Sequence, residues 1–260
     1  CTSGRVASAA AVHATILEIP LSMSGSHMNT GHADTVTGHY DYDYFFNSQK
    51  RNGEIGGKAN LFKFESYIRP DDNVLDFGCG GGFLLNNITC KSKVGVELNP
   101  HARRYCQENH GILAHSSLDA IEDGVFDVVI SNHCIEHVKD PYETIEKLKG
   151  KLRPGGRIVI CVPLDAYSYE WTPHDVCNHL YSFSPMNLGN ILQGVGFTEI
   201  SSRPLLHKWV PKYRLVIRYF GWRAFHWMSH VYGNFVYNSL PIRRKTKWNQ
   251  VLATGLKSQE

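Results

Sequence analysis

The sequence predicts an α/β fold in which helices cover both faces of a mostly parallel, doubly wound sheet. Between residues 73 and 163, short apolar runs alternate with segments of helical periodicity. This alternation is typical of parallel sheets, because consecutive parallel strands need a crossover segment between them. A glycine-rich loop also follows the first apolar run and precedes the first helical segment. Glycines in that position allow backbone amides to approach a ligand closely.

The expected elements follow one another along the chain. We expect strands at residues 74–77, 93–97, 126–131, 157–162, 197–201 and 250–254. We expect helices at residues 82–88, 100–109, 141–152 and 185–194, the last capped by Ser184. An earlier helix should follow a glycine-rich patch and end before Arg69-Pro70.

The composition excludes several classes of protein. The 260 residues are 42% apolar and 20% charged, which rules out a collagen, a coiled coil, a disordered tail and a small disulfide scaffold. No run of about 18 apolar residues is present, so a membrane-spanning helix is not expected. The seven cysteines are scattered without a C-x-x-C pair. That usage favours a reduced, cytoplasmic protein without a zinc ribbon.

The charge is divided unequally along the chain. Residues 200–259 contain eleven Lys and Arg residues and no Asp or Glu, whereas residues 1–199 carry a net charge of −7. This division predicts two surfaces with different partners.

The first 28 residues are set apart from the rest. The chain opens with Cys1, and the run SGSHM at 24–28 resembles a cloning scar before an initiator. We therefore expect residues 1–28 to be a tag or a non-native leader.

A glycine loop flanked by acids carries the clearest functional signal. Residues 76–82 read DFGCGGG, a G-x-G-x-G spacing with an acid two residues ahead. A dinucleotide fingerprint would need glycine at position 83, which is Phe. Glu97 ends the next strand, where a carboxylate can accept hydrogen bonds from both hydroxyls of a ribose. The combination predicts a ligand that contains adenosine.

These motifs resemble those of the class I S-adenosylmethionine-dependent methyltransferases, over roughly residues 70–200 and the last strand. The likeness rests on VLDFGCGGG at 74–82, ELNP at 97–100, FDVVISN at 126–132 and LRPGG at 152–156. It implies a Rossmann-like sheet of seven strands with an antiparallel last strand, a helical insertion before that strand, and S-adenosylmethionine as cofactor. The resemblance implies that Asp76, Gly78 and Gly80 contact the methionine part of the cofactor. It also implies that Glu97 and Leu98 contact the ribose side and that Ser117 and Leu118 lie beside the adenine. Asn132 would lie near the sulfonium.

Histidines follow the fourth-strand motif at the edge where such sheets hold ligands. In one interpretation, His133 or His179 is the general base that accepts the proton of a hydroxyl acceptor. In a second, His133, Glu136, His137 and His179 bind a divalent cation that lowers the pKa of the acceptor. The metal-dependent small-RNA 3′-end and ubiquinone-biosynthesis O-methyltransferases carry a similar run, with an acid where this chain has His133. In a third, Glu136 and His137 cap the following helix and the other histidines shape the pocket.

Residues 205–247 form an insertion dense in aromatic and basic side chains. We expect a helix after Pro211, a break at Gly221 and a second helix that reaches Tyr232, with Leu215, Val216, Tyr219 and Phe220 on one apolar side of the first. Three roles are open for this insertion. It could be a lid packed on the sheet domain or on a dimer partner, a surface that docks at a membrane interface, or a binding site for an anionic substrate. Nucleic acid is the weaker form of that last option, because base-reading motifs are absent.

The domain organisation and the acceptor follow from the same resemblance. We expect residues 71–204 and 248–260 to form the methyltransferase domain, residues 29–70 to cover the cofactor, and residues 205–247 to cap the acceptor pocket. The loop at 171–184 resembles methyltransferases of bacterial polysaccharide and sugar pathways, so the hydroxyl of a sugar or nucleotide sugar is the favoured acceptor. The alternative acceptors are a quinone or lipidic phenol and an RNA 3′ end. An alternative of another class is a partner subunit that binds the cofactor without turnover.

Overall fold

The computed structural model describes residues 42, 44–164, 171, 178–239 and 249–259. All of them lie in the unit that comprises residues 34–260. The expected leader at 1–28 and residues 172–177 of the loop at 171–184 lie outside the described residues.

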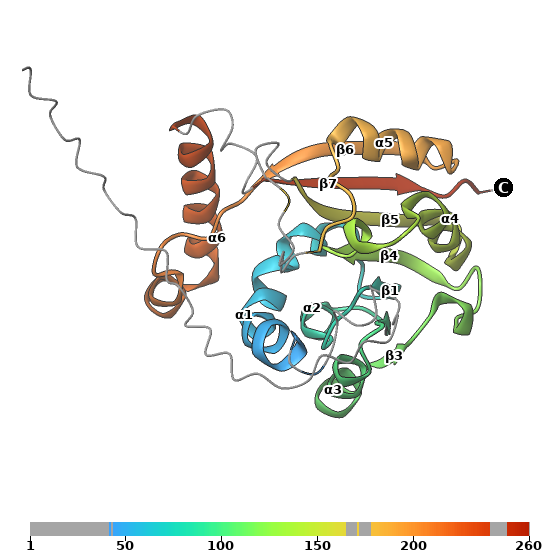
Figure 1. Cartoon of the computed structure of the whole chain (residues 1–260), viewed down its shortest axis with the longest axis horizontal. Coiled ribbons are helices and arrows are strands. Elements are labelled where there is room, and N and C mark those ends of the chain that lie inside the picture. The colour runs from blue at the N-terminus through green and yellow to red at the C-terminus, as the bar shows by residue number, and fades with distance from the viewer. Residues whose placement is uncertain (1–41, 43, 165–170, 172–177, 240–248, 260) are drawn as a thin grey trace, which may run out of the picture. The chain divides into compact units, whose positions relative to one another are not determined.

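A seven-stranded sheet forms the centre of this unit, in the order β3-β2-β1-β4-β5-β7-β6 (Figure 1). The strands are β1 (Asn73–Phe77), β2 (Ser92–Val96), β3 (Leu113–His115), β4 (Phe126–Asn132), β5 (Leu152–Leu164), β6 (Thr198–Leu206) and β7 (Asn249–Leu256). Strands β1 to β5 pair in parallel, whereas β7 runs antiparallel to both β5 and β6. The fold class predicted from the sequence is therefore confirmed. The strand order reverses between β1 and β4, and ligands of open α/β sheets bind at the carboxyl edge beside such a point.

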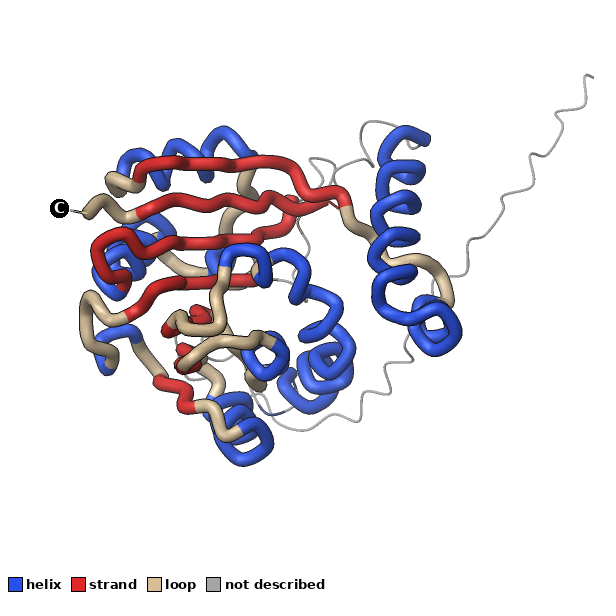
Figure 2. The backbone as a smooth tube through the Cα atoms, turned by 180° about the vertical axis from the view of Figure 1, so that it is seen from behind, coloured by secondary structure: helices blue, strands red, loops and turns tan. Residues whose placement is uncertain are grey.

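Helices pack on both faces of the sheet (Figure 2). They are α1 (Lys50–Asn60), α2 (Phe83–Asn87), α3 (Pro100–His110), α4 (Pro141–Lys151), α5 (Pro185–Gly194) and α6 (Tyr213–Ser239). Adjacent residues of β1 point to opposite faces, so that Val74 belongs to the core beneath α2 and α3 and Leu75 to the core beneath α4 and α5. The predicted cap of α5 is present, because the Ser184 hydroxyl accepts a hydrogen bond from the Asn187 amide at 3.2 Å.

Two elements differ from the sequence prediction. Six of the seven expected strands had a predicted range, and β3 is the one that had none; it has three residues, and Leu113 at its start is half exposed. The glycine-rich patch lies inside α1 rather than before a helix, and α1 ends at Asn60, followed by two 3-10 turns at 61–63 and 65–67. A side chain at Gly53 or Gly57 would collide with Phe83 at the start of α2. Close packing of two helices thus outweighs the low helix propensity of glycine.

The insertion between β6 and β7 is helical, as expected. Helix α6 changes direction at Gly221, which has φ 77° and ψ 178°. Most of the apolar side predicted for its first part is exposed, since Leu215, Tyr219 and Phe220 are 49%, 70% and 71% exposed. Its fourth member, Val216, packs against the cluster formed by Ala59, Val210 and Phe225. Within the described residues, no helix has the length and hydropathy that crossing a bilayer requires.

Candidate active site

The glycine loop connects β1 to α2 at the carboxyl edge of the sheet. The amides of Gly78 and Cys79 donate to the Val96 carbonyl at 2.8 and 3.0 Å, which holds the loop against the end of β2. Gly78 and Gly80 have φ values of 82° and 53°, in the region that favours glycine. A Cβ at Gly78 would also collide with Cys134, in the loop that follows β4. The loop therefore depends on glycine for its backbone angles and for this close approach.

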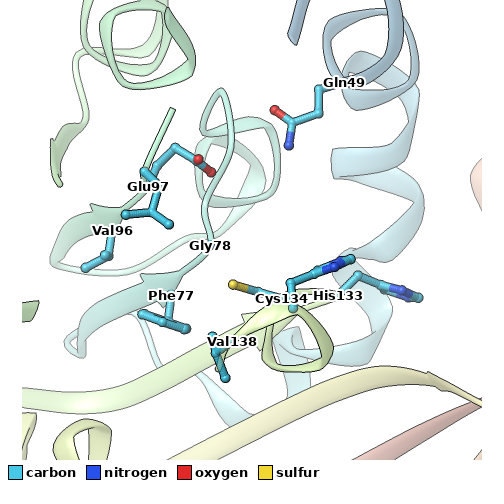
Figure 3. Close-up of a pocket in the computed structure, with 10 residues that line it drawn as sticks. Gln49, Phe77, Gly78, Val96, Glu97, His133, Cys134 and Val138 are labelled. Carbon is cyan, nitrogen blue, oxygen red and sulfur yellow. The ribbon is translucent and has the colours of Figure 1, made fainter. Parts of the chain in front are cut away.

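Glu97 lies directly after β2 and faces the loop. Its Oε2 accepts a hydrogen bond from the Gly80 amide at 2.9 Å, and its Oε1 accepts one from the Asn99 amide at 2.8 Å. Burial raises the pKa of this carboxyl, and the two hydrogen bonds oppose that shift because they favour the charged form. The carboxylate thus joins the glycine loop to the tip of β2 and lines the cavity beside it (Figure 3).

Two cavities meet around the loop. The smaller has a volume of about 110 Å³, and Glu97, Leu98 and Val138 are among its lining residues. The larger, of about 520 Å³, lies between the loop and α1, and Asn52, Asp76 and Trp209 are among its lining residues. Gln49, Gly78 and His133 line both cavities. An elongated ligand could therefore occupy the two together.

Asp76, the next-to-last residue of β1, lines the larger cavity. Its side chain is 2% exposed, and its Oδ1 has no hydrogen-bond partner among the described residues. Burial, with a smaller contribution from Glu97, raises its pKa to about 8. A buried polar atom without a partner is unfavourable, and a ligand that carries a positive charge or an N–H donor would satisfy it. The residues present fit an amino-acid ligand with an ammonium group.

A buried lysine fixes the orientation of Asn132 at the end of β4. The Lys63 ammonium donates a hydrogen bond to Asn132 Oδ1 at 3.1 Å. Because an ammonium has no acceptor atom, this contact identifies the amide oxygen and leaves the amide N–H groups for other partners. Lys63 is 2% exposed, and burial lowers its pKa. Asn132 lines the larger cavity, so it can offer a ligand hydrogen-bond donors there.

His133 follows Asn132 and lines both cavities. Its backbone has φ 55°, and its amide donates to the Cys161 carbonyl at 2.8 Å. Burial lowers the pKa of the imidazole to about 3, and the nearby positive charge of Lys63 adds to the shift. At neutral pH this imidazole is uncharged, and the lowered pKa makes it a weak base in the ligand-free protein.

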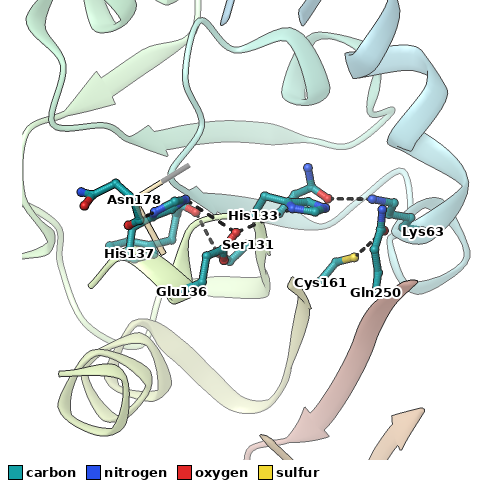
Figure 4. Close-up of polar contacts among 10 residues, drawn as sticks. Lys63, Ser131, His133, Glu136, His137, Cys161, Asn178 and Gln250 are labelled. Carbon is teal, nitrogen blue, oxygen red and sulfur yellow. Dashed lines mark hydrogen bonds and ion pairs between the residues drawn. The ribbon is translucent and has the colours of Figure 1, made fainter. Parts of the chain in front are cut away.

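Glu136 lies between two histidines and is completely buried. Its Oε1 is 3.6 Å from His133 Nδ1 and 3.6 Å from His137 Nε2 (Figure 4). His137 Nδ1 lies 3.1 Å from the Asn178 carbonyl oxygen. One ligating atom from each of Glu136, His137 and His179 lies within 4.8 Å of the others. Three members of the proposed metal set thus come together, and His133 contacts Glu136 without belonging to that group.

Other predicted site residues lie further from the cavities. The Ser117 hydroxyl accepts a hydrogen bond from the Asp119 amide and caps a short 3-10 turn, Leu118–Ala120. Leu118 is 7% exposed and belongs to the core, and neither residue lines the two cavities. Sequence reasoning did not single out Gln49 or Lys63. No motif marks them, because they reach the site only through the packing of the segment that precedes β1.

The fold and the site together define a class I S-adenosylmethionine-dependent methyltransferase architecture: a glycine loop after β1, an acid after β2 and a sheet with an antiparallel last strand. The family model of the methyltransferase domain matches residues 49–202, more than half of the chain. The chain belongs to this family, whose class uses S-adenosylmethionine as cofactor.

Comparisons with individual proteins support the fold. The chain is 31% identical over 104 residues to ribosomal protein L11 methyltransferases of Burkholderia lata and Burkholderia vietnamiensis. These matches cover 37% of the chain and 33% of either relative, so the chain spans about a third of their length. Among solved structures, phosphoethanolamine N-methyltransferase 2 of Haemonchus contortus with S-adenosyl-L-methionine has a TM-score of 0.56 at 18% identity, covering 88% of this chain and 58% of that one. A SAM-dependent methyltransferase of Archaeoglobus fulgidus has a TM-score of 0.56 at 20% identity, covering 83% and 100%.

Proposed function

We propose that this protein transfers a methyl group from S-adenosylmethionine to an oxygen of a small molecule, with the hydroxyl of a sugar or nucleotide sugar as the favoured acceptor. The observation that carries the methyltransferase assignment is Asp76 Oδ1, which has no hydrogen-bond partner among the described residues and lies beside the glycine loop in a cavity of about 520 Å³. In this proposal, Asp76, Gly78 and Gly80 bind the methionine part, and Glu97 binds the ribose with Leu98 beside it. Ser117 and Leu118 are the proposed neighbours of the adenine.

The N-terminal segment is part of the proposed site. Gln49 and Asn52 line the larger cavity from the first turn of α1 and the residue before it. This supports a cofactor-covering role for residues 29–70, of which the structure describes residue 42 and residues 44–70.

The polar groups at the end of β4 favour an oxygen acceptor. Asn132 can donate N–H groups because its carbonyl oxygen is bound to Lys63. Donors and a nearby positive charge stabilise a developing alkoxide and disfavour a cationic amine. This arrangement is what supports oxygen over nitrogen in our proposal.

The chain's own groups would position the acceptor and move its proton. When bound, S-adenosylmethionine supplies an electrophilic methyl group on a sulfonium. Asn132 would hold the acceptor oxygen in line with that group. His133, which is uncharged at neutral pH, is the proposed base. The positive charge of Lys63 lowers its pKa. The negative charge of an alkoxide that forms nearby would offset this effect. His179, whose ring lies 5.0 Å from that of His137, is the alternative base.

A metal-assisted reaction is the second candidate, favoured by the grouping of Glu136, His137 and His179. A carboxylate and two imidazoles are suitable ligands for a divalent cation. Bound there, a cation would supply Lewis-acid activation of the acceptor. The acceptors that go with this candidate are a quinone, a lipidic phenol or an RNA 3′ end. Loss of activity in chelator, restored by one divalent ion, would favour this candidate.

Two measurements test the proposal. Isothermal titration with S-adenosylhomocysteine should give a dissociation constant in the micromolar range, and absence of such binding would reject the cofactor assignment. Transfer of labelled methyl from S-adenosylmethionine to free and nucleotide-linked monosaccharides should then be lost in His133→Ala/His179→Ala. Activity that survives the double substitution would remove the imidazole base. Binding without transfer to any acceptor would favour the alternative of a cofactor-binding partner subunit.

A further inference from the structure

The second part of α6, residues 222–239, has one buried side and one exposed side. Phe225, Ser229 and Gly233 are spaced by four residues and buried, and Phe225 packs in a core cluster with Ala59 and Val210. This side attaches the helix to the rest of the described unit. It leaves the opposite side of the helix to be explained.

That opposite side is an exposed stripe of large apolar residues, which we call the outer stripe. Trp227, Val231 and Phe235 are also spaced by four residues, and they are 68%, 47% and 65% exposed. Trp227 follows Phe225 by two residues, which is about 200° around a helix. The outer stripe therefore faces away from the buried side, and no described residue covers it. Contiguous exposed apolar surface of this kind usually marks a site of interaction.

Helix α6 also exposes basic side chains, one of them in line with the outer stripe and two in the part of the helix before Gly221. Arg223 is exposed and precedes Trp227 by four residues, so it extends the stripe at one end. In the first part of α6, Arg214 and Arg218 are exposed beside Tyr219, and the Arg218 guanidinium lies 5.8 Å from the Tyr219 ring centroid. Residues 200–259 contain no Asp or Glu that could offset these charges. The surface thus combines aromatic, aliphatic and positive groups.

This combination fits a bilayer surface better than a second copy of the chain. Aromatic rings lie in the interfacial layer of a bilayer, while arginine side chains reach anionic headgroups. In a symmetric dimer formed by the same face, two surfaces that both carry exposed arginines would face each other, and their like charge would oppose association.

We propose that the outer stripe of α6 docks this protein on a membrane surface that contains anionic lipid. Trp227 and Phe235 would enter the interfacial layer, and Arg214, Arg218 and Arg223 would contact headgroup phosphates. This docking is independent of the methyl transfer proposed above.

Co-sedimentation with lipid vesicles tests the proposal on the full chain. The protein should sediment with vesicles of phosphatidylcholine and phosphatidylglycerol and much less with phosphatidylcholine alone. Trp227→Ser/Phe235→Ser should lower the partition coefficient by roughly tenfold or more, because two large apolar side chains would no longer be buried in the interfacial layer. The matched control is Trp171→Ser, because Trp171 is 86% exposed and lies outside α6.

Charge reversal gives a second, independent arm. Arg214→Glu/Arg218→Glu should weaken binding to anionic vesicles by about fivefold or more per site, because each basic residue near such a surface contributes about 1 kcal/mol. Arg104→Glu/Lys91→Glu changes the net charge equally at exposed positions elsewhere and should have a smaller effect. Binding of S-adenosylhomocysteine should be the same in all four variants and confirms that they are folded.

Three results would overturn the proposal. The first is absence of binding to anionic vesicles. The second is equal binding by Trp227→Ser/Phe235→Ser and the Trp171→Ser control. The third is a dimer in sedimentation velocity that dissociates in Trp227→Ser/Phe235→Ser while vesicle binding is absent, which would assign the outer stripe to a second copy.

Discussion

Replacing Asp76 by Asn should stabilise the protein to a degree that depends on pH. The pKa of this carboxyl is about 8 in the folded protein, against an ordinary value of 3.8. Between pH 4 and 8 the unfolded chain therefore carries a charged carboxylate while the folded chain keeps the proton. The folded state of the wild type loses stability as pH rises through this window, by a factor of about ten in the unfolding equilibrium per pH unit. Asn does not titrate, so the variant should escape this loss.

The magnitude follows from the size of the shift. About four pH units correspond to on the order of 5 kcal/mol by which the wild type is weakened relative to the variant above pH 8. Urea unfolding of both proteins at pH 5, 6, 7, 8 and 9 would measure the difference in the free energy of unfolding. It should increase steadily from pH 5 to 7 and become constant above pH 8. A difference that is the same at every pH would refute the account of Asp76, whatever its sign.

Cofactor binding provides the functional side of the same prediction. An ammonium group placed against Asp76 favours the carboxylate, so binding of S-adenosylhomocysteine should release a proton. The affinity of the wild type should rise with pH up to about pH 8. Asp76→Asn should bind more weakly, with little pH dependence over this range. Calorimetry in two buffers of different ionisation enthalpy would detect the proton release directly.

The other predictions concern the groups around Asp76 and the loop. Lys63→Met should raise the pKa of His133, because the Lys63 charge lowers it; titration of the imidazole by NMR would show this, and an unchanged pKa would contradict it. Gly78→Ala should lower the free energy of unfolding by about 2–4 kcal/mol and weaken S-adenosylhomocysteine binding, since φ is 82° and the added Cβ would collide with Cys134. A melting temperature equal to that of the wild type would contradict this. Gly53→Ala should destabilise the folded protein, because the added Cβ would collide with Phe83. In the double variant, Phe83→Leu should restore part of the lost stability. Additive losses of stability would show that the two positions do not interact.

Local signals account for the part of the fold that the sequence predicted correctly. The order of strands and helices from 73 to 163 follows from apolar periodicity, and the Ser184 cap follows from a hydroxyl that reaches the backbone three residues on. Strand β3 escaped prediction because three residues show no reliable alternation. The glycines of α1 argued against a helix, since the contact that requires them, Phe83, lies some thirty residues away along the chain.

The sequence by itself determined that Asp76, the glycine loop and Glu97 would come together, because the ends of adjacent parallel strands meet at one edge of a sheet. Only the tertiary structure decided the protonation of Asp76, since its pKa depends on burial and on the neighbouring Glu97. The tertiary structure alone also placed Lys63 against Asn132, 69 residues away. Electrostatic and packing energies depend on distances between segments that no local pattern encodes, which is why these features appeared only once the chain was folded.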